Sequence, residues 1–150
     1  MKKFKFNLEG LLKLRGWEEQ RSRQTLGAIS AEIDRLERSI ETLAEERRYA
    51  VENWGSSNRT SFRPADRMAL SSQLEGIQTL SAETNAALTR ALKQRQEAIE
   101  RLNRAARAKK VVETLKERRL EEYRADVERQ EAKELEDVFN ARRHLEKEAV

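Results

Sequence analysis

The side chains that most often do chemistry are few in this sequence, and their spacing keeps them apart. The chain has one histidine, His144, and no cysteine. The acidic pairs Glu45–Glu46 and Glu121–Glu122 are adjacent in sequence, so on a helix the members of each pair point in different directions and cannot hold one water or metal ion together. The glycines stand singly and form no phosphate-binding loop. We therefore expect a protein that is not an enzyme and needs no cofactor or metal.

A row of cations offers a second kind of chemistry, the binding of a phosphate backbone. These side chains recur at helical spacing and alternate with acidic residues: Arg101, Arg104, Arg107, Lys109 and Lys110. No helix-turn-helix, zinc-finger or basic-zipper pattern accompanies them. We expect no nucleic-acid partner, although a nucleic-acid-binding coiled coil remains an alternative.

The composition indicates which elements carry these side chains. Of the 150 residues, 39% are charged and 5% aromatic, and there is a single proline. Such a composition with heptad spacing is typical of long helices or coiled coils. The apolar residues suffice for a narrow stripe rather than a broad core.

Two ladders of apolar residues predict how the helices pair. The first steps by three and four residues, as in a coiled-coil seam: Leu26, Ile29, Ile33, Leu36, Ile40 and Leu43. The second has the same rhythm: Leu70, Leu74, Ile77, Ser81, Thr84, Leu88 and Ala91. When the chain folds back on itself, facing positions add up to 117, so the bend falls between Asn58 and Arg59. The turn-like run 55–58 lies at the same place. We expect an all-α antiparallel coiled-coil hairpin.

The boundaries follow from this register. We expect a helix over residues 8–54 with Asn7 as its N-cap, a tip loop over 55–63, and a helix over 64–147 that begins at Pro64. All of it would be one elongated domain. Leu8 would lie opposite residue 109, so residues 111–150 would overhang with their apolar stripe uncovered. Because an isolated amphipathic helix is only marginally stable in water, this stripe indicates a partner.

Charge and aromatic residues mark the two ends of the hairpin. Residues 1–24 carry seven Lys/Arg against three Glu, and residues 90–110 carry eight against two. The register places these basic segments side by side, so the open end would suit an acidic partner. At the other end, Tyr49, Trp54, Phe62 and Met68 surround the bend, where exposed aromatics could anchor a partner. No apolar run is long enough to span a bilayer and no signal-peptide pattern appears, so we expect a cytoplasmic protein.

Both ends of the sequence resemble one protein family. The opening run from Phe4 to Arg15, FKFNLEGLLKLR, is similar to the start of the FliJ family of flagellar export proteins. Late in the chain, Lys109–Lys110, the run 115–119, Glu122–Tyr123 and the run 131–137 resemble a second stretch of that family. Members usually have Asp-Glu where this chain has Glu136–Asp137, which is a small departure.

The resemblance implies an antiparallel coiled coil similar to the central stalk of rotary ATPases, acting in flagellum biogenesis, type III protein export and motility. It implies insertion into the hexameric export ATPase, stimulation of ATP hydrolysis, a link to the cytoplasmic domain of the membrane export gate, and handling of export chaperones. The protein would be peripheral to the inner membrane through its partners, and a monomer when free. The implied ATPase contacts are Phe4, Phe6, Leu8, Leu11, Leu12, Arg15, Lys109, Lys110, Leu115, Lys116, Arg118, Arg119, Tyr123, Glu131, Lys133 and Leu135. The expected gate contacts near the bend are Tyr49, Trp54, Leu74 and Ile77.

Two further alternatives stay open at this point. The stalk of a non-flagellar type III secretion system would share all of this physical chemistry. A general coiled-coil scaffold would instead associate with itself through residues 111–150.

Overall fold

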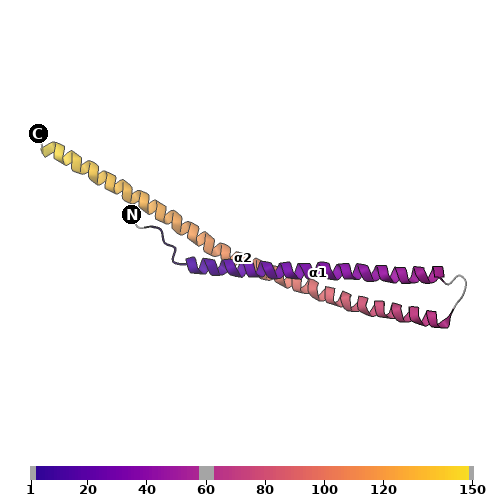
Figure 1. Ribbon diagram of the computed structural model, residues 1–150. Helices are drawn as coiled ribbons and strands as arrows, with labels where there is room; N and C mark the ends of the chain where they lie inside the picture. Colours follow the sequence, from indigo (N-terminus) through magenta and orange to yellow (C-terminus); the bar gives the residue numbers. More distant parts are fainter. Residues whose placement is uncertain (1–2, 58–62, 149–150) are drawn as a thin grey trace. The chain divides into compact units, whose positions relative to one another are not determined.

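Two helices account for nearly all of the chain (Figure 1). The computed structural model describes the backbone of residues 3–57 and 63–148, and the side chains of residues 3–56 and 63–143. Helix α1 spans Glu9–Ser57 with 49 residues, and helix α2 spans Pro64–Glu148 with 85 residues. Within these ranges there is no strand. The predicted all-helical hairpin with a longer second helix is confirmed.

The helix ends differ slightly from the predicted ones. Asn7 and Leu8 form a turn, and the amide of Leu12 donates to the carbonyl of Leu8 at 2.9 Å, so Leu8 takes the N-cap position expected for Asn7. Helix α1 continues to Ser57, three residues past Trp54. Helix α2 begins at Pro64 as predicted, because proline's fixed φ and missing amide suit the first turn. The predicted pivot at Asn58–Arg59 and the aromatic Phe62 lie outside the described residues.

Contacts between the helices divide the chain into two compact units. We call residues Gln20–Arg104 the loop unit. We call Met1–Glu19 together with Ala105–Val150 the base unit. Each unit contains a segment of α1 and a segment of α2.

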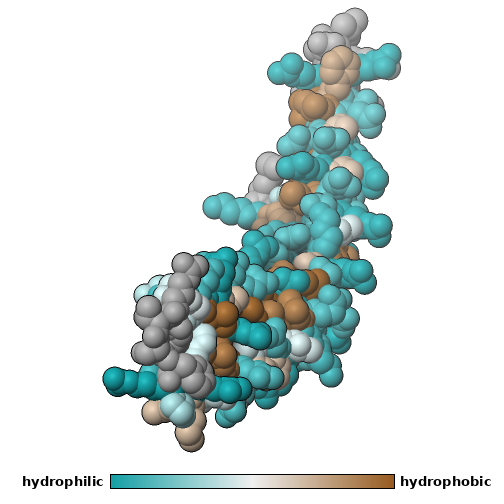
Figure 2. Space-filling view, turned by 90° about the vertical axis from the view of Figure 1, so that its right-hand side faces the viewer, coloured by the Kyte–Doolittle hydropathy of each residue, from teal (hydrophilic) through white to brown (hydrophobic). Residues whose placement is uncertain are grey.

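The loop unit is built on the predicted seam. Its core consists of Ile33, Leu36 and Ala91, with Ile29, Ala87 and Leu88 packed against them. Ile33 is only 3% exposed. In this unit α1 and α2 run side by side in opposite directions (Figure 1). On the face shown in Figure 2, hydrophobic side chains occupy small areas between hydrophilic ones. The seam therefore buries a narrow stripe and leaves the rest of each helix to solvent.

The base unit corrects the predicted register and the predicted length of the overhang. The sequence register places Glu9 opposite residue 108, but Glu9 forms its ion pair with Lys116, about one heptad further along α2. Val112 is buried rather than overhanging, and Tyr123 lies against Phe4. Residues 3–8 are not helical, and an extended residue advances about 3.3 Å, against about 1.5 Å in a helix, so the arm reaches Tyr123 more easily than a helical segment would. The shift of Glu9 itself belongs to the helix pairing, because Glu19 likewise meets Lys109 rather than residue 98.

Candidate partner-binding surface

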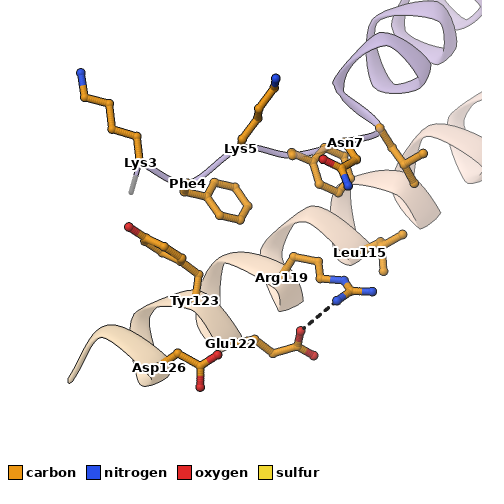
Figure 3. Close-up of a pocket in the computed structure, with 11 residues that line it drawn as sticks. Lys3, Phe4, Lys5, Asn7, Leu115, Arg119, Glu122, Tyr123 and Asp126 are labelled. Atoms are coloured by element: carbon orange, nitrogen blue, oxygen red, sulfur yellow. Dashed lines mark ion pairs between the residues drawn. The ribbon is translucent and has the colours of Figure 1, made fainter. Parts of the chain in front are cut away.

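Residues 3–8 form an arm that lies along α2 in the base unit (Figure 3). The ring centroids of Phe4 and Tyr123 are 5.6 Å apart, with the ring planes inclined by 50°. The ammonium group of Lys116 lies 5.9 Å from the ring centroid of Phe6 and 2.7 Å from a carboxylate oxygen of Glu9. At such partly exposed positions each contact contributes about 1 kcal/mol or less. The arm is thus held by several weak contacts rather than by a buried core.

The arm has two different faces because its sequence alternates. In an extended segment successive side chains point to opposite sides. Phe4 accordingly turns toward Tyr123, whereas Lys3 and Lys5 point away from α2 (Figure 3). Lys3 and Lys5 form no ion pair within the described part of the chain. The arm therefore presents its cations to solvent and its rings to the helix.

Further along the base unit, a polar contact joins the helices in place of an apolar one. The Nζ of Lys109 lies 2.8 Å from a carboxylate oxygen of Glu19 and 3.7 Å from one of Glu113. The hydrogen bond that Lys109 donates to Glu19, and then the attraction between the two charges, raise the pKa of Lys109 above its usual range. Extended back from Leu26, the first ladder reaches Ser22, Glu19 and Arg15, so Glu19 is a polar residue at a seam position. The charge pair fixes which turns of α1 and α2 face each other in this unit.

Beyond the arm, α2 carries apolar residues that nothing in the described chain covers. All residues from 128 to 143 are exposed. Leu135 is 71% exposed and Phe139 is 76% exposed, with Val138 beside them. Monomeric soluble proteins seldom leave such side chains together in water unless a partner covers them. This overhang is shorter than the sequence predicted, because half-buried residues continue along α2 as far as Val127, whereas the prediction had it begin at residue 111.

The residues implied as ATPase contacts all lie in the base unit. The structure brings together Phe4 with Tyr123 and Phe6 with Lys116. Leu11 and Leu12 of α1 are half-buried, and Leu8, directly before α1, is exposed. The remaining cations and the overhang residues are at least partly exposed: Lys109, Lys110, Lys116, Arg118, Arg119, Glu131, Lys133 and Leu135. Arg15 and Arg119 form ion pairs with Glu18 and Glu122, respectively.

The residues expected to contact the gate lie in the loop unit and differ in accessibility. Tyr49 is 67% exposed, whereas Ile77 is 8% exposed and belongs to the seam. Leu74 and Trp54 are half-buried, and Met68 is exposed. Of the four expected gate contacts, Tyr49 is the exposed one, so it can meet a partner without a change in helix packing.

Sequence reasoning did not single out Trp17, which is 75% exposed on α1. The heptad pattern could have identified it, because residue 17 lies on the side of the helix opposite to the seam positions Arg15, Glu19 and Ser22. It also missed Glu9 as the partner of Lys116, since that contact depends on the register and on the extended arm.

The described residues offer little for other kinds of site. They contain no group of three or more His, Cys, Asp or Glu side chains able to hold a metal ion. In the predicted cation row, Arg101 is paired with Glu97 and Lys109 with Glu19, so part of its charge is already neutralised. The side chain of His144 lies outside the described residues. Neither α1 nor α2, over its described length, has a stretch apolar enough to cross a membrane.

A helical hairpin with a covered seam, a base of weak polar contacts and an exposed apolar overhang defines a coiled-coil class of protein. A profile of the family described as the flagellar FliJ protein matches residues 4–149. The chain therefore belongs to the FliJ family and is a component of flagellar type III protein export. No curated protein and no solved structure matches the chain.

Proposed function

We propose that this chain is a stalk subunit that binds and stimulates the hexameric export ATPase and links it to the cytoplasmic domain of the membrane export gate. The base unit engages the ATPase and the loop unit meets the gate. The protein acts at the cytoplasmic face of the inner membrane at the flagellar base and is held there by its partners. It is a monomer when free, and it also handles export chaperones.

The exposed apolar overhang is the observation that carries this proposal. Leu135, Val138 and Phe139 are exposed, and no segment within the described chain covers them. Burying such side chains at a protein interface removes apolar surface from water, which is the main favourable term in association. The basic residues Lys110 and Arg118 are exposed nearer the arm, and they suit an acidic lining on the ATPase.

The test is the double variant Leu135→Ala/Phe139→Ala in the full chain, with the purified export ATPase as partner. We expect affinity to fall about tenfold or more, because interface anchors of this size often contribute over 1 kcal/mol each. ATPase stimulation at a fixed subunit concentration should fall in parallel. The matched control is Leu80→Ala/Met68→Ala, which removes two exposed apolar side chains from the loop unit and should leave ATPase binding unchanged.

A chain ending at residue 126 sharpens the test, because it keeps the arm contacts and lacks the exposed overhang. Full binding and stimulation by this shortened chain would contradict the proposal. So would equal losses from the overhang variant and its control.

The gate contact rests on the accessibility of Tyr49. Because Ile77 is buried and Leu74 and Trp54 are half-buried, substituting these residues would disturb the seam as well as any interface. Tyr49 is free of this ambiguity. Cross-linking from position 49 to the cytoplasmic domain of the gate tests the contact, and the absence of such a cross-link in export-competent cells would argue against it.

A further inference from the structure

The arm over α2 occupies a surface that continues into the overhang. Leu120, Val127 and Val138 lie on nearly the same side of α2, because 7 and 18 residues correspond to about two and five helical turns. Leu120 and Val127 are half-buried, whereas Val138 is exposed. Tyr123, on the neighbouring part of this face, is covered by Phe4. On this side of α2 the apolar residues near the arm are therefore covered by the chain itself, whereas Val138, beyond Glu131 and Glu134, is open.

The contacts that hold the arm are of a kind that a partner can replace. The Glu9–Lys116 pair, at the first residue of α1 directly after the arm, has side chains that are 46% and 37% exposed, so water and salt screen it. The amide of Glu9 donates to the carbonyl of Phe6 at 3.3 Å, and no helical ladder supports the residues before it. Phe4 meets α2 through one tilted ring contact. No part of the arm is buried in the core.

The outward cations give a partner something to hold. Lys3 and Lys5 point away from α2 and have no ion-pair partner within the described residues (Figure 3). An acidic surface that approached the base unit would attract them and could draw the arm off the helix. The same movement would free Lys116 and Tyr123.

We propose that the arm is a displaceable cover that competes with the ATPase for α2. In the free protein Phe4 and Phe6 shield Tyr123 and the Lys116 side chain. On engagement the arm leaves, and the partner occupies a face that runs from Lys116 to Val138. This inference rests on the proposed binding of the export ATPase by the base unit. It adds that a protein with its arm fixed on α2 binds poorly.

The arm can be locked in place chemically because the chain has no cysteine. The variant Phe4→Cys/Tyr123→Cys, joined by a short bismaleimide, keeps the arm on α2. We expect its affinity for the ATPase to be about tenfold or more below that of the same variant left unjoined, because only the open state is competent. The matched control joins Ile29→Cys to Leu88→Cys in the seam of the loop unit, which leaves the arm free and should not change binding.

A second variant opens the arm without touching its rings. Glu9→Gln removes the charge that pairs with Lys116, and we expect tighter ATPase binding, by about two- to fivefold, as the open fraction rises. Amide hydrogen exchange, measured without any partner and corrected for the intrinsic rate of the new residue, should become faster at residue 9, whose amide donates to the carbonyl of Phe6 in the arm. This readout reports on the arm independently of the ATPase.

The outcomes separate the two proposals. Equal binding by the joined and unjoined Phe4→Cys/Tyr123→Cys protein would overturn the cover and leave the stalk assignment intact. Weaker binding by Glu9→Gln, or unchanged exchange at residue 9, would also overturn the cover. If neither wild type nor Glu9→Gln bound the ATPase, the stalk assignment itself would fail, and the cover with it.

Discussion

Lys109 donates a hydrogen bond of 2.8 Å to Glu19, a residue ninety positions away in the sequence. The Lys109 and Glu19 side chains are 33% and 15% exposed, respectively. The pair joins α1 to α2 where the seam residues Arg15 and Glu19 supply no apolar contact. In this region of the base unit, the helices are aligned by charge.

Replacing Glu19 by Gln should weaken the base unit in a pH-dependent way. The pKa of Lys109 is raised, first by the hydrogen bond to Glu19 and then by its charge. A lysine whose pKa is higher in the folded state adds stability below its unfolded pKa of about 10.4, and that stability is lost as the pH rises through the folded value. Thermal unfolding followed by circular dichroism should therefore give a higher melting temperature for wild type than for Glu19→Gln near neutral pH. The difference in melting temperature should shrink at strongly alkaline pH.

Glu113 provides the control for this experiment. It lies 3.7 Å from Lys109 on the same helix and contributes less to the pKa shift than Glu19. Glu113→Gln should have the smaller effect on melting. A difference between wild type and Glu19→Gln that stayed constant up to pH 12 would show that the Lys109 charge is not responsible.

Ile33→Ala should be strongly destabilising for the loop unit. Ile33 is 3% exposed and lies at the centre of the core with Leu36 and Ala91. Removing three carbons from a buried site costs about 2–4 kcal/mol through lost transfer free energy and the cavity left behind. Urea unfolding followed by circular dichroism measures the change. Leu80→Ala, at a half-exposed position, should stay within about 0.5 kcal/mol of wild type.

Arg35→Gln should raise the pKa of Glu32. The Arg35 guanidinium donates hydrogen bonds of 2.8 and 2.6 Å to the two carboxylate oxygens, and these bonds are the main reason that the pKa of Glu32 lies below its usual range. The resulting stability is present above the unfolded carboxyl pKa of about 4.3 and is lost as the pH falls through the folded value.

Carboxyl carbon chemical shifts followed by NMR between pH 2 and 7 report this pKa directly. Arg38→Gln removes a nearby arginine that forms no ion pair with Glu32 and serves as the control. An unchanged Glu32 titration in Arg35→Gln would show that the hydrogen bonds are not maintained in solution.

Tyr49→Ala should separate gate binding from folding. Because Tyr49 is 67% exposed, its removal should change the free energy of unfolding by about 0.5 kcal/mol or less. Binding to the cytoplasmic domain of the gate should weaken about tenfold if the ring is an interface anchor. Ile77→Ala, at a buried seam position, should lower stability clearly in the same measurements. Unchanged gate binding by Tyr49→Ala would exclude this residue from the interface.

The helical hairpin could be predicted because heptad spacing is a local property of the sequence. Ile33, Leu36, Leu88 and Ala91 were placed in the seam by their spacing alone, and they form or flank the core. Pro64 was likewise predicted to start α2 from its backbone chemistry. These features depend on neighbouring residues, so a single sequence is enough to find them.

The register of the base unit could not be predicted in the same way. The sum of facing positions assumed helix from Leu8 onward and a bend fixed by the ladders of the loop unit. In the structure the arm is extended and the first helix reaches Ser57. The side chain of Lys116 is long enough to reach Glu9 on the other helix. Side-chain reach and the point at which a helix begins are set by tertiary contacts. For the same reason the overhang was predicted too long.

Small residues make up much of the core of this protein. Ala50, Ala91 and Ala98 are among its most buried residues. In the described part of the chain no large side chain is completely sealed from solvent. The packing between the helices is therefore shallow, and the side chains that make it lie close to solvent.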